Sequence, residues 1–88
     1  MNDFTFTGQG FSDYLYWQTQ DKKTLKKINS LLADIQRNGA MQGIGKPEPL
    51  KGNLTGFWSR RVDEEHRLVY AVEDSAVVVI SCRGHYDD

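Results

Sequence analysis

Residues 56–82, GFWSRRVDEEHRLVYAVEDSAVVVISC, decide the fold because they hold three strand-like runs separated by two polar turns. The runs cover residues 56–62, 67–72 and 76–82, and each is rich in the β-branched and aromatic residues that strands favour. The polar segments at 63–66 and 73–75 are short and rich in turn-forming residues. This stretch therefore predicts an antiparallel meander.

The middle run presents a different set of residues on each face of the predicted sheet. Leu68 and Tyr70 alternate with Arg67 and Val69, and successive residues of a strand point to opposite faces. We expect the face with Leu68 and Tyr70 to pack on helices. The other face carries an arginine and is expected to stay free for a ligand.

The N-terminal half predicts one strand and two helices. Phe4 and Phe6 alternate with polar residues, as in a short strand, and an aromatic-rich helix follows with Thr7 or Ser12 as its N-cap. A second helix is predicted from an N-cap at Asp21 to a stop signal at residues 38–39. Its apolar stripe consists of Leu25, Ile28, Leu31, Leu32 and Ile35. Its lysine-rich face is either solvated or a docking surface for RNA phosphates.

Residues 39–56 connect the helices to the meander and read as a long ordered loop. They contain five of the eight glycines and both prolines, with little periodicity. Loops of this length in compact domains are usually functional. The order of the elements predicts a single α+β domain over residues 1–88, with a small antiparallel sheet of about four strands packed on two N-terminal helices.

Composition narrows the class of protein. The chain has 88 residues, a net charge of −1 and 39% hydrophobic residues, which is typical of a soluble globular domain. We find no membrane-spanning stretch and no secretory signal, and the single cysteine, Cys82, is expected to be a buried inert thiol. These features predict a cytoplasmic location. The net charge argues against a protein that finds bare nucleic acid by bulk electrostatics.

One group of residues suits RNA cleavage. Glu48 lies between two prolines that restrict its backbone, and arginines at 60, 61, 67 and 83 precede a terminal His85. A carboxylate accepts a proton, an imidazole donates one, and guanidinium groups hold a phosphate. No Cys/His cluster has metal-ligand spacing, and no glycine loop fits a nucleotide motif. We therefore expect a metal-independent enzyme without a cofactor.

Several long motifs carry a resemblance to a known family. They are DYLYW at 13–17, GKPEPLK at 45–51, GFWSRR at 56–61, EEHRLVY at 64–70 and RGHY at 83–86. Together these motifs closely resemble the YoeB/Txe family of RelE-superfamily toxins. The resemblance implies a RelE-like fold and a ribosome-dependent mRNA interferase, an endoribonuclease that inhibits translation. It also implies a bacterial type II toxin-antitoxin pair, with a YefM/Axe-type antitoxin, the 70S ribosome and mRNA as partners, and a homodimer.

The resemblance also assigns roles to individual residues. The general base of the family falls on Glu48, its phosphate-contacting arginine on Arg67, its general acid on His85 and its terminal aromatic on Tyr86. Lys51, Arg61 and Arg83 are expected to contact RNA or its phosphates. Two further acidic residues follow Tyr86, where such sequences often stop.

Two other classes of function compete with this interpretation. A non-catalytic module of the same fold would inhibit its target by occupying it, but it would not need Glu48, Arg67 and His85 together. A DNA-binding regulator would need a basic recognition helix in a helix-turn-helix pair, and the chain offers no such partner helix. His66, at the start of the middle strand, is interpreted as structural.

Overall fold

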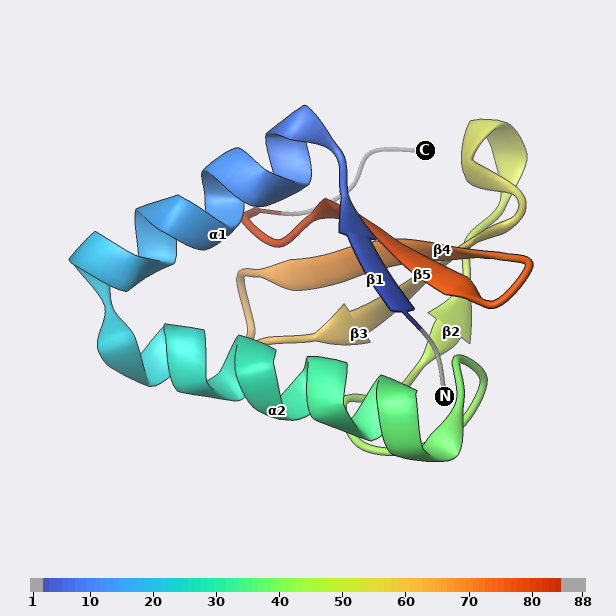
Figure 1. Ribbon diagram of the computed structural model, residues 1–88, viewed down its shortest axis with the longest axis horizontal. Coiled ribbons are helices and arrows are strands. Elements are labelled where there is room, and N and C mark those ends of the chain that lie inside the picture. Colours follow the sequence, from blue (N-terminus) through green and yellow to red (C-terminus); the bar gives the residue numbers. More distant parts are fainter. Residues whose placement is uncertain (1–2, 85–88) are drawn as a thin grey trace.

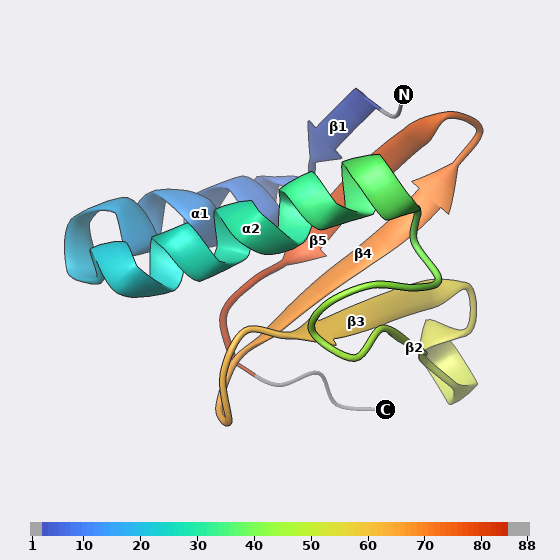
Figure 2. The same cartoon turned by 90° about the horizontal axis from the view of Figure 1, so that it is seen from below.

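The computed structural model describes residues 3–84, which form a five-stranded sheet with two helices over one face (Figures 1 and 2). The elements in chain order are β1 (Asp3–Phe6), α1 (Gly8–Gln20), α2 (Lys22–Asn38), β2 (Glu48–Pro49), the 3-10 turn η1 (Gly52–Leu54), β3 (Phe57–Arg61), β4 (Arg67–Glu73) and β5 (Ala76–Ser81). The predicted α+β class, the two helices and the C-terminal meander are confirmed.

The sheet differs from the expectation in two details, because it contains an extra strand and is not wholly antiparallel. Its order is β1-β5-β4-β3-β2, and β1 pairs parallel to β5. The connection after β1 is long and begins with the two helices, so β1 can pair in parallel with the outer edge of β5. The two phenylalanines of β1 pack against the core there. The extra strand, β2, is only two residues long and lies inside the segment expected to be a loop. Pro49 is tolerated there because an edge strand needs no donor on its outer side.

The second helix begins and ends at the residues that the sequence indicated, and Thr7 is the one of the two candidate caps that starts the first helix. The Thr7 hydroxyl accepts a hydrogen bond from the Gly10 amide at 3.0 Å and caps α1. The Asp21 carboxylate accepts bonds from Lys23 and Thr24 at the start of α2, and the bonds from Thr24 chiefly lower the pKa of Asp21. Gly39 ends α2 with a φ of +89°. Within residues 3–84, neither helix is long and apolar enough to cross a membrane.

The core lies between the helices and the sheet. Its buried members are Trp17, Ile28, Leu31, Leu32, Ile35, Val62, Leu68, Tyr70, Val77, Val79 and Cys82. The aromatic residues Tyr14, Tyr16 and Trp58 are partly buried against it. This placement confirms the predicted helix stripe and the buried thiol.

The second face of the sheet is not as free as expected. Val69 and Ala71, which point away from Leu68 and Tyr70, are only 4% and 5% exposed. Leu50 is also buried and continues the pairing of β2 with β3 through a hydrogen bond from its amide to the Phe57 carbonyl. Apolar side chains therefore cover the centre of this face.

Candidate active site

The strand register places three of the expected site residues on one face of the sheet. Glu48 pairs with Ser59 on β3, and Arg61 pairs with Arg67 on β4. Directly paired residues point to the same side, and so do residues two apart in a strand. Glu48, Arg61 and Arg67 therefore share the face opposite the helices. A proton-accepting carboxylate and two guanidinium groups on one face can serve an acidic, phosphate-bearing ligand.

Arg67 is anchored at the start of β4. Its Nη1 donates to the carbonyl oxygens of Asp63 at 2.8 Å and His66 at 3.1 Å, and its side chain is half-buried. Its backbone amide donates to the Gly84 carbonyl at 3.0 Å. These bonds hold the guanidinium over the turn between β3 and β4, so its direction is set before a ligand arrives.

Glu48 lies in a short segment that the backbone restrains on both sides. Upstream, the Gly45 carbonyl accepts a 2.7 Å hydrogen bond from the Arg61 amide, and Lys46 has a positive φ of 53°. Downstream, the Leu50 amide donates to the Phe57 carbonyl, and the exposed Lys51 follows just before η1. The expected long loop is ordered, as predicted, but it is ordered by pairing with β3 and not by turns alone.

Arg60 is set apart from the other arginines because it points into the core. It is fully buried, and its five N–H groups donate to the Asp34 carboxylate, the Tyr70 hydroxyl and the carbonyl oxygens of Gly39, Gln42 and Ile44. The alternation of β3 explains this direction, since Arg60 lies between two residues of the opposite face. The prediction that Arg60 belongs to a phosphate-binding cluster of arginines is therefore wrong, because Arg60 has a structural role.

Arg83 follows β5 and lies against α1. Its guanidinium carbon is 3.7 Å from the centre of the Tyr16 ring, a stacked cation–π contact, and the residue is exposed. Stacking uses the face of the guanidinium and leaves its N–H edge to other partners. A phosphate contact for Arg83 stays a prediction.

The expected general acid, His85, and the terminal aromatic, Tyr86, lie outside the described residues. The chain up to that point is firmly held, because Cys82 and Gly84 both bond to other elements. The Cys82 amide donates to Asp13 at 3.0 Å, and the Trp17 indole donates to the Cys82 carbonyl at 2.9 Å. Gly84, the last described residue, is bonded through its carbonyl to the backbone amide of Arg67.

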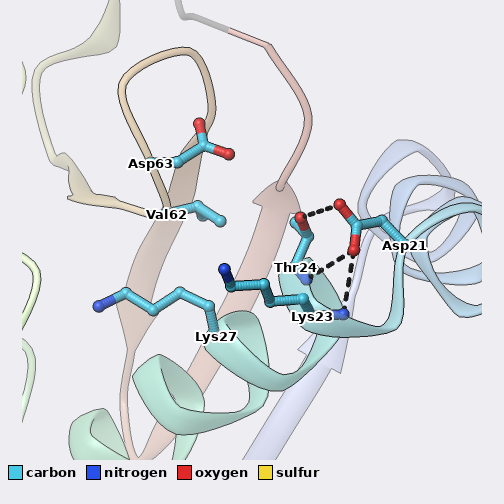
Figure 3. Close-up of a pocket in the computed structure, with 6 residues that line it drawn as sticks. All are labelled: Asp21, Lys23, Thr24, Lys27, Val62 and Asp63. Carbon is cyan, nitrogen blue, oxygen red and sulfur yellow. Dashed lines mark hydrogen bonds between the residues drawn. The ribbon is translucent and has the colours of Figure 1, made fainter.

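Several hollows open on the described surface. A hollow of about 440 Å³ lies between the start of α2 and the turn after β3 (Figure 3). It is lined by Asp21, Lys23, Thr24, Lys27, Val62 and Asp63. A neighbouring hollow of about 360 Å³ reaches Lys46 and Arg61. Neither is lined by Glu48 or Arg67. Of the candidate site residues named above, only Arg61 lines one of these two hollows.

Three side chains hold the C-terminal segment. His66, interpreted as structural, accepts a hydrogen bond from the Gly84 amide at 2.7 Å, whereas sequence reasoning missed the bonds that Asp13 and Trp17 of α1 make to Cys82. Their spacing of four residues, which places an aspartate and a tryptophan on one side of a helix, was the available signal. Their partners are backbone groups some 65 residues away, which no local pattern reveals.

Comparison with known proteins identifies relatives over almost the whole chain. The family of YoeB-like toxins of bacterial type II toxin-antitoxin systems matches residues 6–86. Toxin YoeB of Escherichia coli K12 is 58% identical over 78 residues, which cover 89% of this chain and 92% of the relative. The structure of the YoeB dimer from Staphylococcus aureus has a TM-score of 0.89 at 58% identity, covering 97% of this chain and 98% of that one. The heterotetrameric YoeB-YefM complex from the same organism has a TM-score of 0.89 at 57% identity, covering 98% of this chain and 99% of the toxin chain.

Proposed function

This chain belongs to the family of YoeB-like toxins of bacterial type II toxin-antitoxin systems, and we propose that it acts as a ribosome-dependent mRNA endoribonuclease. The reaction is an attack by the RNA's own 2'-hydroxyl on the adjacent phosphorus. It needs a group to take the proton, cationic groups to stabilise the charged transition state, and a group to protonate the leaving oxygen. No metal ion or cofactor is required for these steps.

Glu48, Arg67 and His85 supply the three groups. Glu48 removes the 2'-hydroxyl proton, O2' forms a bond to phosphorus, and the bond from phosphorus to O5' breaks. His85 gives a proton to O5', so the products are a 2',3'-cyclic phosphate and a 5'-hydroxyl. Arg67 stabilises the charge on the non-bridging oxygens, Arg61, Arg83 and Lys51 hold neighbouring phosphates, and Tyr86 stacks on a base.

The observation that carries this proposal is the pairing of Arg61 with Arg67 on the face that also bears Glu48. Like charges placed directly opposite each other on neighbouring strands destabilise a sheet. A bound phosphate removes that penalty, because it accepts hydrogen bonds from both guanidinium groups. An anionic ligand beside a carboxylate base is the arrangement that RNA cleavage needs.

The proposal extends to partners. A YefM-type antitoxin is expected to bind and neutralise this chain, as the solved YoeB-YefM complexes suggest for their own toxin chains. A homodimer is expected by analogy with the YoeB dimer. The ribosome would present mRNA, in the cytoplasm, to the face that bears Glu48 and Arg67.

The experiment is cleavage of an mRNA during translation in a cell-free system, mapped at nucleotide resolution. Wild type is compared with Glu48→Gln and Arg67→Gln, and with Asp74→Asn in the turn after β4 and Arg37→Gln on α2 as controls at exposed positions. The site variants should lose about 10²-fold or more in rate, while the controls cleave like wild type. Block of translation without any cut by wild type would instead support inhibition by occupancy.

A further inference from the structure

Gly84 is held between two consecutive residues at the start of β4. Its amide donates to His66 Nδ1 at 2.7 Å, and its carbonyl accepts from the Arg67 amide at 3.0 Å. Both backbone groups of Gly84 are thus bound to consecutive residues, the side chain of His66 just before β4 and the backbone of Arg67, its first residue. Gly84 also has a φ of +79°, a conformation that favours glycine. The direction in which the chain leaves Gly84 is therefore strongly constrained.

The imidazole of His66 is itself fixed by its surroundings. Its side chain is only 16% exposed, and its ring meets the Trp17 ring edge to face, with centroids 4.8 Å apart. Nδ1 accepts a hydrogen bond, so the ring proton belongs on Nε2, which lies 3.5 Å from a Glu65 carboxylate oxygen. Trp17 in turn donates to the Cys82 carbonyl, two residues before Gly84. His66 and Trp17 together hold the backbone of this segment.

We propose that His66 is a positioning residue for catalysis, which acts by holding the Gly84 amide and so directing the segment that carries His85. The proposal rests on the proposed function, in which His85 is the general acid. His85 is the next residue after Gly84, and Arg67 is the next residue after His66. The two bonds thus fix Gly84, the residue before His85 in the sequence, relative to Arg67. A general acid must lie within hydrogen-bond reach of the leaving oxygen, so loosening Gly84 should lower the rate.

His66 makes two contacts, a hydrogen bond from the Gly84 amide and a ring contact with Trp17, and two variants separate them. His66→Asn keeps an acceptor near the position of Nδ1 but loses most of the ring. His66→Phe keeps a flat ring against Trp17 but has no acceptor for the Gly84 amide. If His66 only filled space, His66→Phe would be the milder change, whereas a positioning role makes it the more severe one.

The test measures two properties of wild type, His66→Asn and His66→Phe. The first is the hydrogen exchange of the Gly84 amide by NMR, in the free protein. The second is mRNA cleavage during translation as a function of toxin concentration, which separates the maximal rate from the half-saturating concentration. A thermal unfolding curve for each variant establishes that it is folded.

We expect His66→Phe to expose the Gly84 amide to exchange and to lower the maximal rate by about 10²-fold with an unchanged half-saturating concentration. His66→Asn should keep amide protection and most of the rate. A His66→Phe variant that exchanges freely yet cuts at the wild-type rate would overturn the proposal, and so would an Asn variant as slow as the Phe variant. If wild type itself cuts no mRNA, the proposed function fails and the catalytic role of His66 fails with it. The exchange data then still decide whether His66 holds Gly84.

Discussion

Arg60 and Asp34 form a buried ion pair in which Nη1 and Oδ2 are 2.6 Å apart. Arg60 comes from β3 and Asp34 from α2, so the pair joins the sheet to the helix layer. The same guanidinium binds three carbonyl oxygens between residues 39 and 44. One fully satisfied side chain therefore shapes the start of the segment that leads to Glu48.

Replacing Arg60 should cost much of the stability of this small domain. Arg60→Met leaves a buried carboxylate without its partner and several carbonyl groups without a donor, and we expect a loss of about 3–5 kcal/mol. Arg61→Met on the same strand is the matched control, because Arg61 is exposed, and it should change stability by about 0.5 kcal/mol or less. Urea unfolding monitored by tryptophan fluorescence measures both. Equal effects of the two variants would contradict the structural role of Arg60.

Asp34 should make stability dependent on acid pH. The hydrogen bond from Arg60 is the main cause that holds the pKa of Asp34 below its usual value, with further donors at Asn38 and Ile44. As the pH falls, the Asp34 carboxylate is therefore protonated in the unfolded chain before it is protonated in the folded chain. The stability that Asp34 contributes is thus present above about pH 4 and is lost below it. Asp34→Asn should be less stable than wild type at pH 7, with a difference that shrinks toward pH 3. A difference independent of pH would refute this linkage.

Two glycines in α1 should respond in opposite directions to alanine. A Cβ at Gly10 would lie 2.3 Å from the Val79 carbonyl oxygen, whereas a Cβ at Gly8 would meet nothing within 4 Å. Gly10→Ala must push α1 away from β5 and should cost about 1–3 kcal/mol. Gly8→Ala restricts the unfolded chain and should be neutral or stabilise by up to about 1 kcal/mol. Thermal unfolding of the two variants tests the close approach of α1 to β5. A destabilising Gly8→Ala together with a neutral Gly10→Ala would disprove it.

Cys82 should be unreactive in the folded protein. Burial, and to a lesser degree the nearby Asp13 carboxylate, raises the pKa of the thiol to about 12. Thiols react as thiolates, so at pH 8 alkylation should proceed only when the domain unfolds. Labelling with iodoacetamide in buffer and in denaturant measures this. Labelling in buffer at the rate of the denatured chain would show that the thiol is accessible.

The sequence was sufficient for the elements whose signals are local. The cap at Asp21, the stop at Gly39 and the alternation around Leu68 each depend on neighbouring residues, and the structure confirms the corresponding helix and strand. The site residues Glu48 and Arg67 came from motifs, and the register then placed them on one face. Their catalytic roles remain predictions.

The features that the sequence did not reveal depend on distant partners. The parallel pairing of β1 with β5 joins residues more than 70 positions apart. From the sequence, Arg60 could not be distinguished from Arg61 and Arg67 as a phosphate ligand. Its structural role depends on Asp34, which lies on a helix that faces the same side of β3. Asp34 itself lies three residues after Leu31 of the apolar stripe, a spacing that places it on the core side of α2. That spacing, combined with the alternation of β3, was the available clue to the pair.

The central claim is that the 2'-hydroxyl of the mRNA is the nucleophile. The most direct measurement is cleavage, by the wild-type toxin during translation, of an mRNA in which the ribose at the mapped cut site carries a single 2'-deoxy substitution. The mechanism predicts that this mRNA is translated but not cut at that site, while the unmodified mRNA yields a 2',3'-cyclic phosphate and a 5'-hydroxyl. Cleavage of the 2'-deoxy mRNA at the same bond would contradict it, because the attacking group would then have to be water or a group of the protein.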